Sequence, residues 1–257
     1  MNFFQIGLLL ITGILAGFIN ALGGGGAIII LPILILLGLP PTIANGTNRI
    51  STFSSCLISV LNYRHRGFFY PKLSILLGIP ALIGSIFGAK VGVFISEELF
   101  KNTLAIIMIF VLIVILKRPG NESFKEFSEE KLSSIRIIIF MIIFFGIGFY
   151  GGFIQIGIGF LIIVAVSLFA DMSLLKINSL KLLIILIYTV FSLPVYIVNN
   201  KVNFTFGIIL AIGSAIGGYV GSNFAVDKGD KWIKYFLVCM ILALSAKLLG
   251  LFKYINL

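Results

Sequence analysis

The first 48 residues carry no formally charged side chain, and Arg49 is the first ionic group of the chain. A helix rises about 1.5 Å per residue and the hydrocarbon layer of a bilayer is about 30 Å thick, so this run is too long for one straight crossing. The glycine tetrad Gly23–Gly26 interrupts it. We expect a full span over about Phe3–Leu22, a glycine break, and a second apolar piece to about Gly38, either a re-entrant half-helix or a short span.

Composition supports an all-α integral membrane protein. Only 11% of the 257 residues are charged and 60% are hydrophobic, whereas roughly a quarter of a typical soluble domain is charged. This balance excludes a soluble enzyme, a disulfide scaffold and a nucleic-acid binder. The formal net charge of +10 comes mostly from short connections, where basic residues orient spans and contact anionic lipids. The sequence predicts no metal site and no cofactor, and it contains no phosphate-binding loop for ATP.

A second charge-free run, 137–170, repeats the first, because glycines also interrupt it in the middle. Gly17 and Gly148 are 131 positions apart, and the basic residues Arg49 and Lys181 are 132 positions apart. Matched markers at nearly one offset indicate an internal duplication.

The remaining apolar segments complete about eight transmembrane helices, four per repeat, and each repeat opens with a glycine-broken helix. We predict a single membrane domain over 1–257, with a first repeat at 3–116, a linker loop at 117–136 and a second repeat at 137–253. The expected spans after the first break are 48–63, 73–95 and 99–116, followed by 174–198, 204–226 and 231–252 in the second half. With eight crossings, the basic loops favour cytoplasmic termini. If each broken run adds a crossing, the repeats become inverted and this count fails.

The two breaks and the two cations are the candidate binding groups. Broken membrane helices are stable where they line a cavity or are buried in protein, and in secondary transporters paired breaks tend to form the substrate site. A cation within a span usually faces an interior cavity, so Arg49 and Lys181 would attract an anion. The alternatives are close helix packing for the glycines and, for the cations, extension of the side chain to the membrane interface.

Two further patterns are open to a structural reading. The glycines spaced by four near Gly84 and Gly213 favour helix packing over ligand binding. Asn48, Thr52, Ser55, Ser59 and Asn62 share one helical face. Such a polar face either hydrogen-bonds to a neighbouring helix or lines a wet path.

Three parts of the sequence resemble the sulfite exporter TauE/SafE family. They are the segment Gly17–Gly26 followed by Pro32, the Thr47-Asn48-Arg49 segment, and Gly148–Phe153 with Gly157 and Gly159. The resemblance covers essentially the whole chain. It implies a multi-pass permease of the bacterial cytoplasmic (inner) membrane that moves sulfite, sulfoacetate or related organosulfur anions. Family members often carry an acid where this chain has Asn20 and Gly151, and usually a lysine where it has Arg49.

The sequence therefore predicts a secondary transporter, not an enzyme, whose partner is a small anionic solute; a homo-oligomer stays open. The alternative is a non-transporting membrane scaffold or assembly factor that uses the glycines only for packing. In the transporter, glycine backbones would donate hydrogen bonds, the two cations would supply charge, and neutral side chains would complete the site. The predicted substrate-binding residues are Gly23, Gly24, Gly25, Gly26, Asn48, Arg49, Gln155, Gly157, Gly159, Asn178 and Lys181.

Overall fold

The computed structural model describes residues 2–96, 98–99, 134–169 and 172–248, and all regular elements within them are α-helices. This confirms the expected all-α class. The helices are α1 (Phe3–Leu22), α2 (Ala27–Leu36), α3 (Pro41–His65), α4 (Pro71–Phe94), α6 (Ser134–Phe153), α7 (Ile158–Phe169), α8 (Leu174–Val198) and α9 (Phe204–Leu248). The predicted span over 99–116 and most of the 117–136 linker lie outside the described residues.

Four of these helical stretches are long and apolar enough to cross a membrane: α1, α4, α8 and the Phe204–Ile233 part of α9. The limits of α1 and α8 coincide with the predicted spans. α3 instead begins at Pro41, seven residues before the predicted start. Proline is favoured in the first helical turn because it has no N–H to leave unpaired. Arg49 therefore lies two turns inside α3 rather than at its start.

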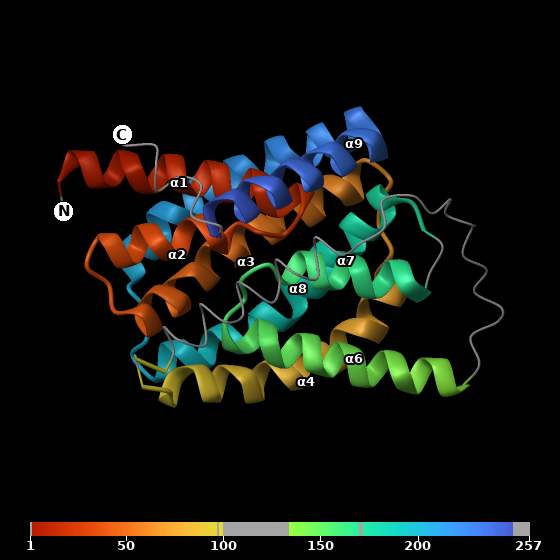
Figure 1. Cartoon of the computed structure of the whole chain (residues 1–257), viewed down its shortest axis with the longest axis horizontal. Coiled ribbons are helices and arrows are strands. Elements are labelled where there is room, and N and C mark those ends of the chain that lie inside the picture. Colours follow the sequence, from red (N-terminus) through yellow and green to blue (C-terminus); the bar gives the residue numbers. More distant parts are fainter. Residues whose placement is uncertain (1, 97, 100–133, 170–171, 249–257) are drawn as a thin grey trace.

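α9 contains a sharp break at Gly229, whose backbone angles are φ 70° and ψ −170°. Positive φ is accessible to glycine at little cost. The chain reverses direction at this residue (Figure 1), so that α9 consists of two helical arms. The sequence predicted two separate spans here, over 204–226 and 231–252.

The helices form three layers (Figure 1). α1 packs along α9 at the top of the view, α4 packs along α6 at the bottom, and α3 and α8 lie between these pairs. Glycines make both outer contacts close: a Cβ placed on Gly217 would strike the carbonyl oxygen of Ile14, and one on Gly88 would strike that of Phe149. The structure therefore agrees with the prediction that both glycine series serve helix packing.

Helix directions follow from the residues that meet. Gly213 contacts Leu10 of α1 and Gly221 contacts Phe18, so α1 and the first arm of α9 are parallel. α3 runs the same way, because it is hydrogen-bonded in order along α9. α4, α6 and α8 run in the opposite direction (Figure 1).

Since α1 and α3 share a direction, α2 leads the chain back between them. Each broken run is thus a hairpin, and α1 and α6 point opposite ways. The count of basic loops that assumed eight crossings does not hold for this topology. Reciprocal packing of α1 on α9 and α6 on α4 is what two inverted, related halves would produce. The duplication and its boundaries stay predictions.

Candidate functional site

The two glycine breaks meet in space. Gly24 has φ +82°, and a Cβ built on it would collide with the Cα of Gly159. The Gly159 N–H donates a hydrogen bond to the Gly24 carbonyl oxygen, at 3.3 Å. Only glycine permits this approach of two backbones. The structure therefore brings together the predicted residues of the first and second halves.

Some of the expected backbone donors are already engaged. The N–H groups of Gly23 and Gly24 donate to the Ile19 carbonyl at 2.8 and 3.1 Å, and thereby close the last turn of α1. Together with Gly159, three predicted donors have internal partners. Gly25, Gly26 and Gly157 donate to no backbone carbonyl in the part of the chain that the structure describes.

Arg49 and Lys181 are both fully buried, with 0% of each side chain exposed. The side chains therefore face the protein interior and do not reach the membrane interface. Among the residues whose burial is described, no aspartate or glutamate is buried. Within the residues whose burial is described, the interior thus holds two cations and no buried acid to pair with them.

Arg49 holds the end of α6. Its Nη2 donates to the Gly152 carbonyl, its Nη1 donates to Ser192 Oγ at 2.9 Å, and its guanidinium lies 4.4 Å from the centre of the Tyr196 ring. One turn earlier, Asn45 Nδ2 donates to the Phe153 carbonyl at 2.7 Å. It also donates to the Tyr196 hydroxyl, at 2.8 Å. We call Asn45, Arg49 and Tyr196 the Arg49 cap.

Lys181 holds the end of α1 in the same way. Its Nζ donates to the Asn20 carbonyl at 3.0 Å and to Asn178 Oδ1. Asn178 Nδ2 donates to the Ala21 carbonyl at 2.5 Å and to the Tyr63 hydroxyl at 3.1 Å. We call Tyr63, Asn178 and Lys181 the Lys181 cap.

The two caps correspond residue by residue. Asn45 and Asn178 are 133 positions apart, as are Tyr63 and Tyr196. Asn45, Tyr63 and Tyr196 were not among the predicted site residues. Their offset of 133 is one or two positions larger than the offsets of the cations and the glycines, so a search that allowed for this shift would have paired them.

The chemistry of the caps follows from helix geometry. The last carbonyls of a helix lack intrahelical partners and carry partial negative charge, which favours a cation nearby. Breaking α1 and α6 inside the protein creates two such ends, and in each case an asparagine and a cation from the other half satisfy them. The caps therefore tie the halves together across the breaks.

Asn48 and Gln155 form a separate link beside the Arg49 cap. Asn48 Nδ2 donates to Gln155 Oε1 at 3.2 Å, and Gln155 Nε2 donates to Thr189 Oγ1 at 3.1 Å and to the Tyr188 hydroxyl at 3.3 Å. Gln155 has φ 64°, which is unusual for a residue with a side chain. The link holds the second break against α3 and α8.

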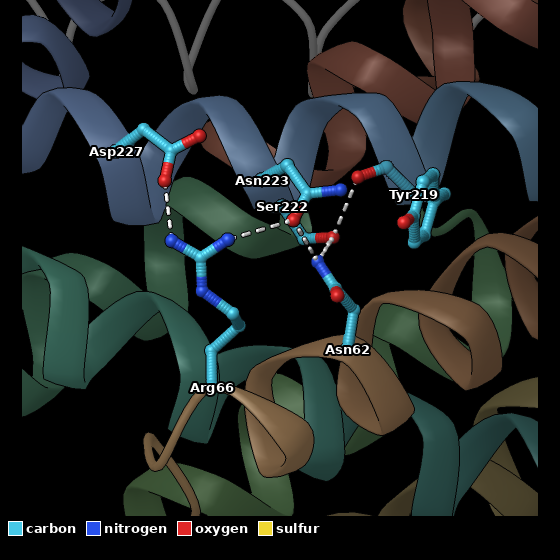
Figure 2. A network of polar contacts seen from close by, with 6 residues as sticks. All are labelled: Asn62, Arg66, Tyr219, Ser222, Asn223 and Asp227. Atoms are coloured by element: carbon cyan, nitrogen blue, oxygen red, sulfur yellow. Dashed lines mark hydrogen bonds and ion pairs between the residues drawn. The ribbon is translucent and has the colours of Figure 1, made fainter.

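Much of the polar face of α3 hydrogen-bonds to its neighbours. Ser55 Oγ accepts from Asn20 of α1 at 3.2 Å, and Ser59 Oγ donates to the Gly218 carbonyl of α9 at 3.0 Å. Figure 2 shows the network at the end of α3, where Asn62 contacts Ser222 and Asn223 and where Arg66 forms an ion pair with Asp227. From Ser55 onward, this face serves helix packing.

The first turns of α3 differ. Four buried polar atoms lack a hydrogen-bond partner in the described part of the chain, and all four belong to this segment: Thr42 Oγ1, Asn45 Oδ1, Asn48 Oδ1 and Arg49 Nε. Buried polar groups are normally paired, with protein or with ordered water. These atoms therefore mark unused hydrogen-bonding capacity beside the Arg49 cap.

Comparison with known proteins gives a consistent result. A family model described as Sulfite exporter TauE/SafE matches residues 9–248. The chain is 25% identical over 250 residues to a "Probable membrane transporter protein" of a Sinorhizobium species, covering 97% of this chain and 94% of that protein. It is 26% identical over 248 residues to "Probable membrane transporter protein YfcA" of Escherichia coli, covering 95% and 89%. No solved structure matches this chain significantly. The chain therefore belongs to the sulfite exporter TauE/SafE family of membrane transporters and is a multi-pass protein of the bacterial inner membrane.

Proposed function

We propose that this protein exports a small oxyanion, sulfite or an organic sulfonate, through the interface between its two halves. The observation that carries the proposal is the pair of fully buried cations with no buried acid among the described residues. A buried charge without a counter-charge is costly, and backbone carbonyls compensate it only in part. A mobile anion is the complementary partner for such an interior.

The printed name of the family supports the choice of anion, because sulfite is itself a small oxyanion. Membrane potential would supply the driving force. In a cell that is negative inside, an anion is driven outward by about 2.3 kcal/mol per charge per 100 mV. Export therefore needs no coupling carboxylate.

Replacing Arg49 with glutamine tests the proposal. The variant keeps a hydrogen-bond donor near Gly152 but removes the charge. We therefore expect sulfite flux in proteoliposomes to fall at least about tenfold, which corresponds to a loss of roughly 1.4 kcal/mol in anion binding. Sulfate, sulfoacetate and taurine would be compared in the same assay. Lys90→Gln is the matched control, because Lys90 is an exposed cation on α4.

A non-transporting scaffold would behave differently. Wild-type protein would then carry none of the probe anions, and Arg49→Gln would alter only stability. Wild-type flux that persists unchanged in Arg49→Gln, or that is indifferent to collapse of the membrane potential, would contradict the proposed mechanism.

A further inference from the structure

The first turns of α3 and α8 occupy equivalent positions in the two halves, but their backbone N–H groups have different partners. Leu175 stands 133 positions after Thr42, and each lies in the first turn of its helix. At α8, the N–H groups of Leu174 and Leu175 donate to the two carboxylate oxygens of Asp230, at 3.0 and 2.8 Å. The protein thus already holds an oxyanion of its own at the start of α8.

Among the described residues, no carboxylate is hydrogen-bonded to the start of α3. The N–H groups of Thr42 and Ile43 have no backbone acceptor among the described residues, and Pro41 has no N–H. The Thr42 side chain is only 1% exposed, and its hydroxyl has no hydrogen-bond partner within the described ranges. A helix N-terminus favours an anion through its free N–H groups and its dipole. Here an unpartnered buried hydroxyl adds a further donor.

The orphaned atoms continue from this point into the protein. Thr42, Asn45 and Arg49 follow one face of α3 at helical spacing, and each has a buried polar atom that no described residue hydrogen-bonds. Thr42 and Arg49 are about 10 Å apart along the helix axis, at 1.5 Å per residue. We therefore treat the start of α3 and the Arg49 cap as two separate positions for an anion. Asn45 Oδ1 lies between them and can accept a hydrogen bond from water that accompanies a hydrated anion.

A cation lies in the chain segment beside this face. The segment after α8 packs against the first turns of α3: a Cβ on Gly46 would strike the Lys201 carbonyl, and the Asn203 N–H donates to Thr47 Oγ1 at 2.9 Å. Lys201 thus adds positive charge at the same end of the molecule as the N-terminus of α3.

We propose that the N-terminus of α3 is a second oxyanion site, distinct from Arg49, at which a sulfite-sized anion occupies the place that the Asp230 carboxylate takes at α8. Thr42 supplies the hydroxyl and the backbone N–H, and Asn45 connects this site to Arg49. This inference rests on the proposed transport function, since the site is one end of the route to the buried cation.

Two substitutions of Thr42 test the site. Thr42→Val removes the hydroxyl while keeping the shape, and we expect the KM for sulfite flux to rise about tenfold, the effect of losing one hydrogen bond to an anion. Thr42→Asp places a carboxylate at the helix start, as Asp230 does at α8. We expect it to abolish flux while the melting temperature stays the same or rises, because an acid in the first turn stabilises a helix. Thr12→Val, at a buried threonine of α1, is the matched control and keeps the wild-type KM.

A binding measurement separates this inference from the proposed function. Sulfite should raise the melting temperature of the purified wild-type protein in a concentration-dependent way, and less so that of Thr42→Val. If wild-type protein binds sulfite in this manner but carries none across liposomes, the transport function fails and the site stands. If wild-type flux is intact and both Thr42 variants keep the wild-type KM and thermal shift, the site proposal is overturned.

Discussion

At the scale of single residues, the Tyr196 hydroxyl has more hydrogen-bond partners than any other side chain of the Arg49 cap. The Tyr196 hydroxyl accepts from Asn45 and donates toward the Gly152 and Phe153 carbonyls, at 3.2 and 3.0 Å. Tyr196→Phe leaves these groups without that partner in a buried setting. We expect a loss of about 1–3 kcal/mol in the free energy of unfolding, measured by denaturant titration in detergent. Tyr219→Phe is the control, because the Tyr219 side chain is 54% exposed; an equal loss in both variants would contradict this account of the cap.

At the scale of helices, close backbone contact decides how α4 and α6 pair. A Cβ on Gly88 would collide with the Phe149 carbonyl oxygen, and this backbone atom cannot move without disturbing α6. We expect Gly88→Ala to destabilise the protein by about 1–3 kcal/mol, the usual cost of overpacking. Gly146→Ala, on α6, is the matched control: a Cβ there meets nothing within 4 Å, and alanine favours a helix by about 1 kcal/mol over glycine. The melting temperature should thus fall in Gly88→Ala and rise in Gly146→Ala. A shift in the same direction in both variants would show that the Gly88 contact does not limit the packing of α4 on α6.

At the scale of the whole molecule, charge distribution orients the protein once the helix directions are known. Arg49 and Lys181 are fully buried; of the other basic side chains whose exposure the structure describes, six lie at the end at which α3 finishes: Arg64, Arg66, Lys72, Lys176, Lys228 and Lys231. Two of them, Lys90 and Lys201, lie at the end at which α3 starts. The positive-inside rule therefore places the finish of α3 in the cytoplasm and the start of α1 outside it. The proposed site at Thr42 would then lie toward the extracytoplasmic side, where an exported anion leaves.

Cysteine labelling tests this orientation. In a background without Cys56 and Cys239, Asn2→Cys should react with a membrane-impermeant maleimide in intact cells. Lys72→Cys should react only after permeabilisation, since both positions are exposed but lie at opposite ends. The reverse pattern would place the start of α1 in the cytoplasm.

The sequence by itself determined the membrane class, the two glycine breaks and the limits of α1 and α8, because hydrophobic length, absence of charge and glycine position are local properties. It also singled out Arg49 and Lys181, since a cation inside an apolar run stands out without any knowledge of its neighbours. An offset of 133 positions, close to the 131 and 132 of the glycines and cations, pairs Asn45 with Asn178 and Tyr63 with Tyr196, although each residue looks ordinary by itself.

Only the tertiary structure decided what each of these groups contacts. The cations bind carbonyls of the opposite half, and the Asp230 carboxylate binds the start of α8. These contacts join residues more than fifty positions apart. Hydrogen bonds to helix ends are short-ranged and directional, so they form only where packing brings the partners together. Helix direction is likewise set by packing, and the orientation inferred from the basic loops depended on the number of crossings that was assumed.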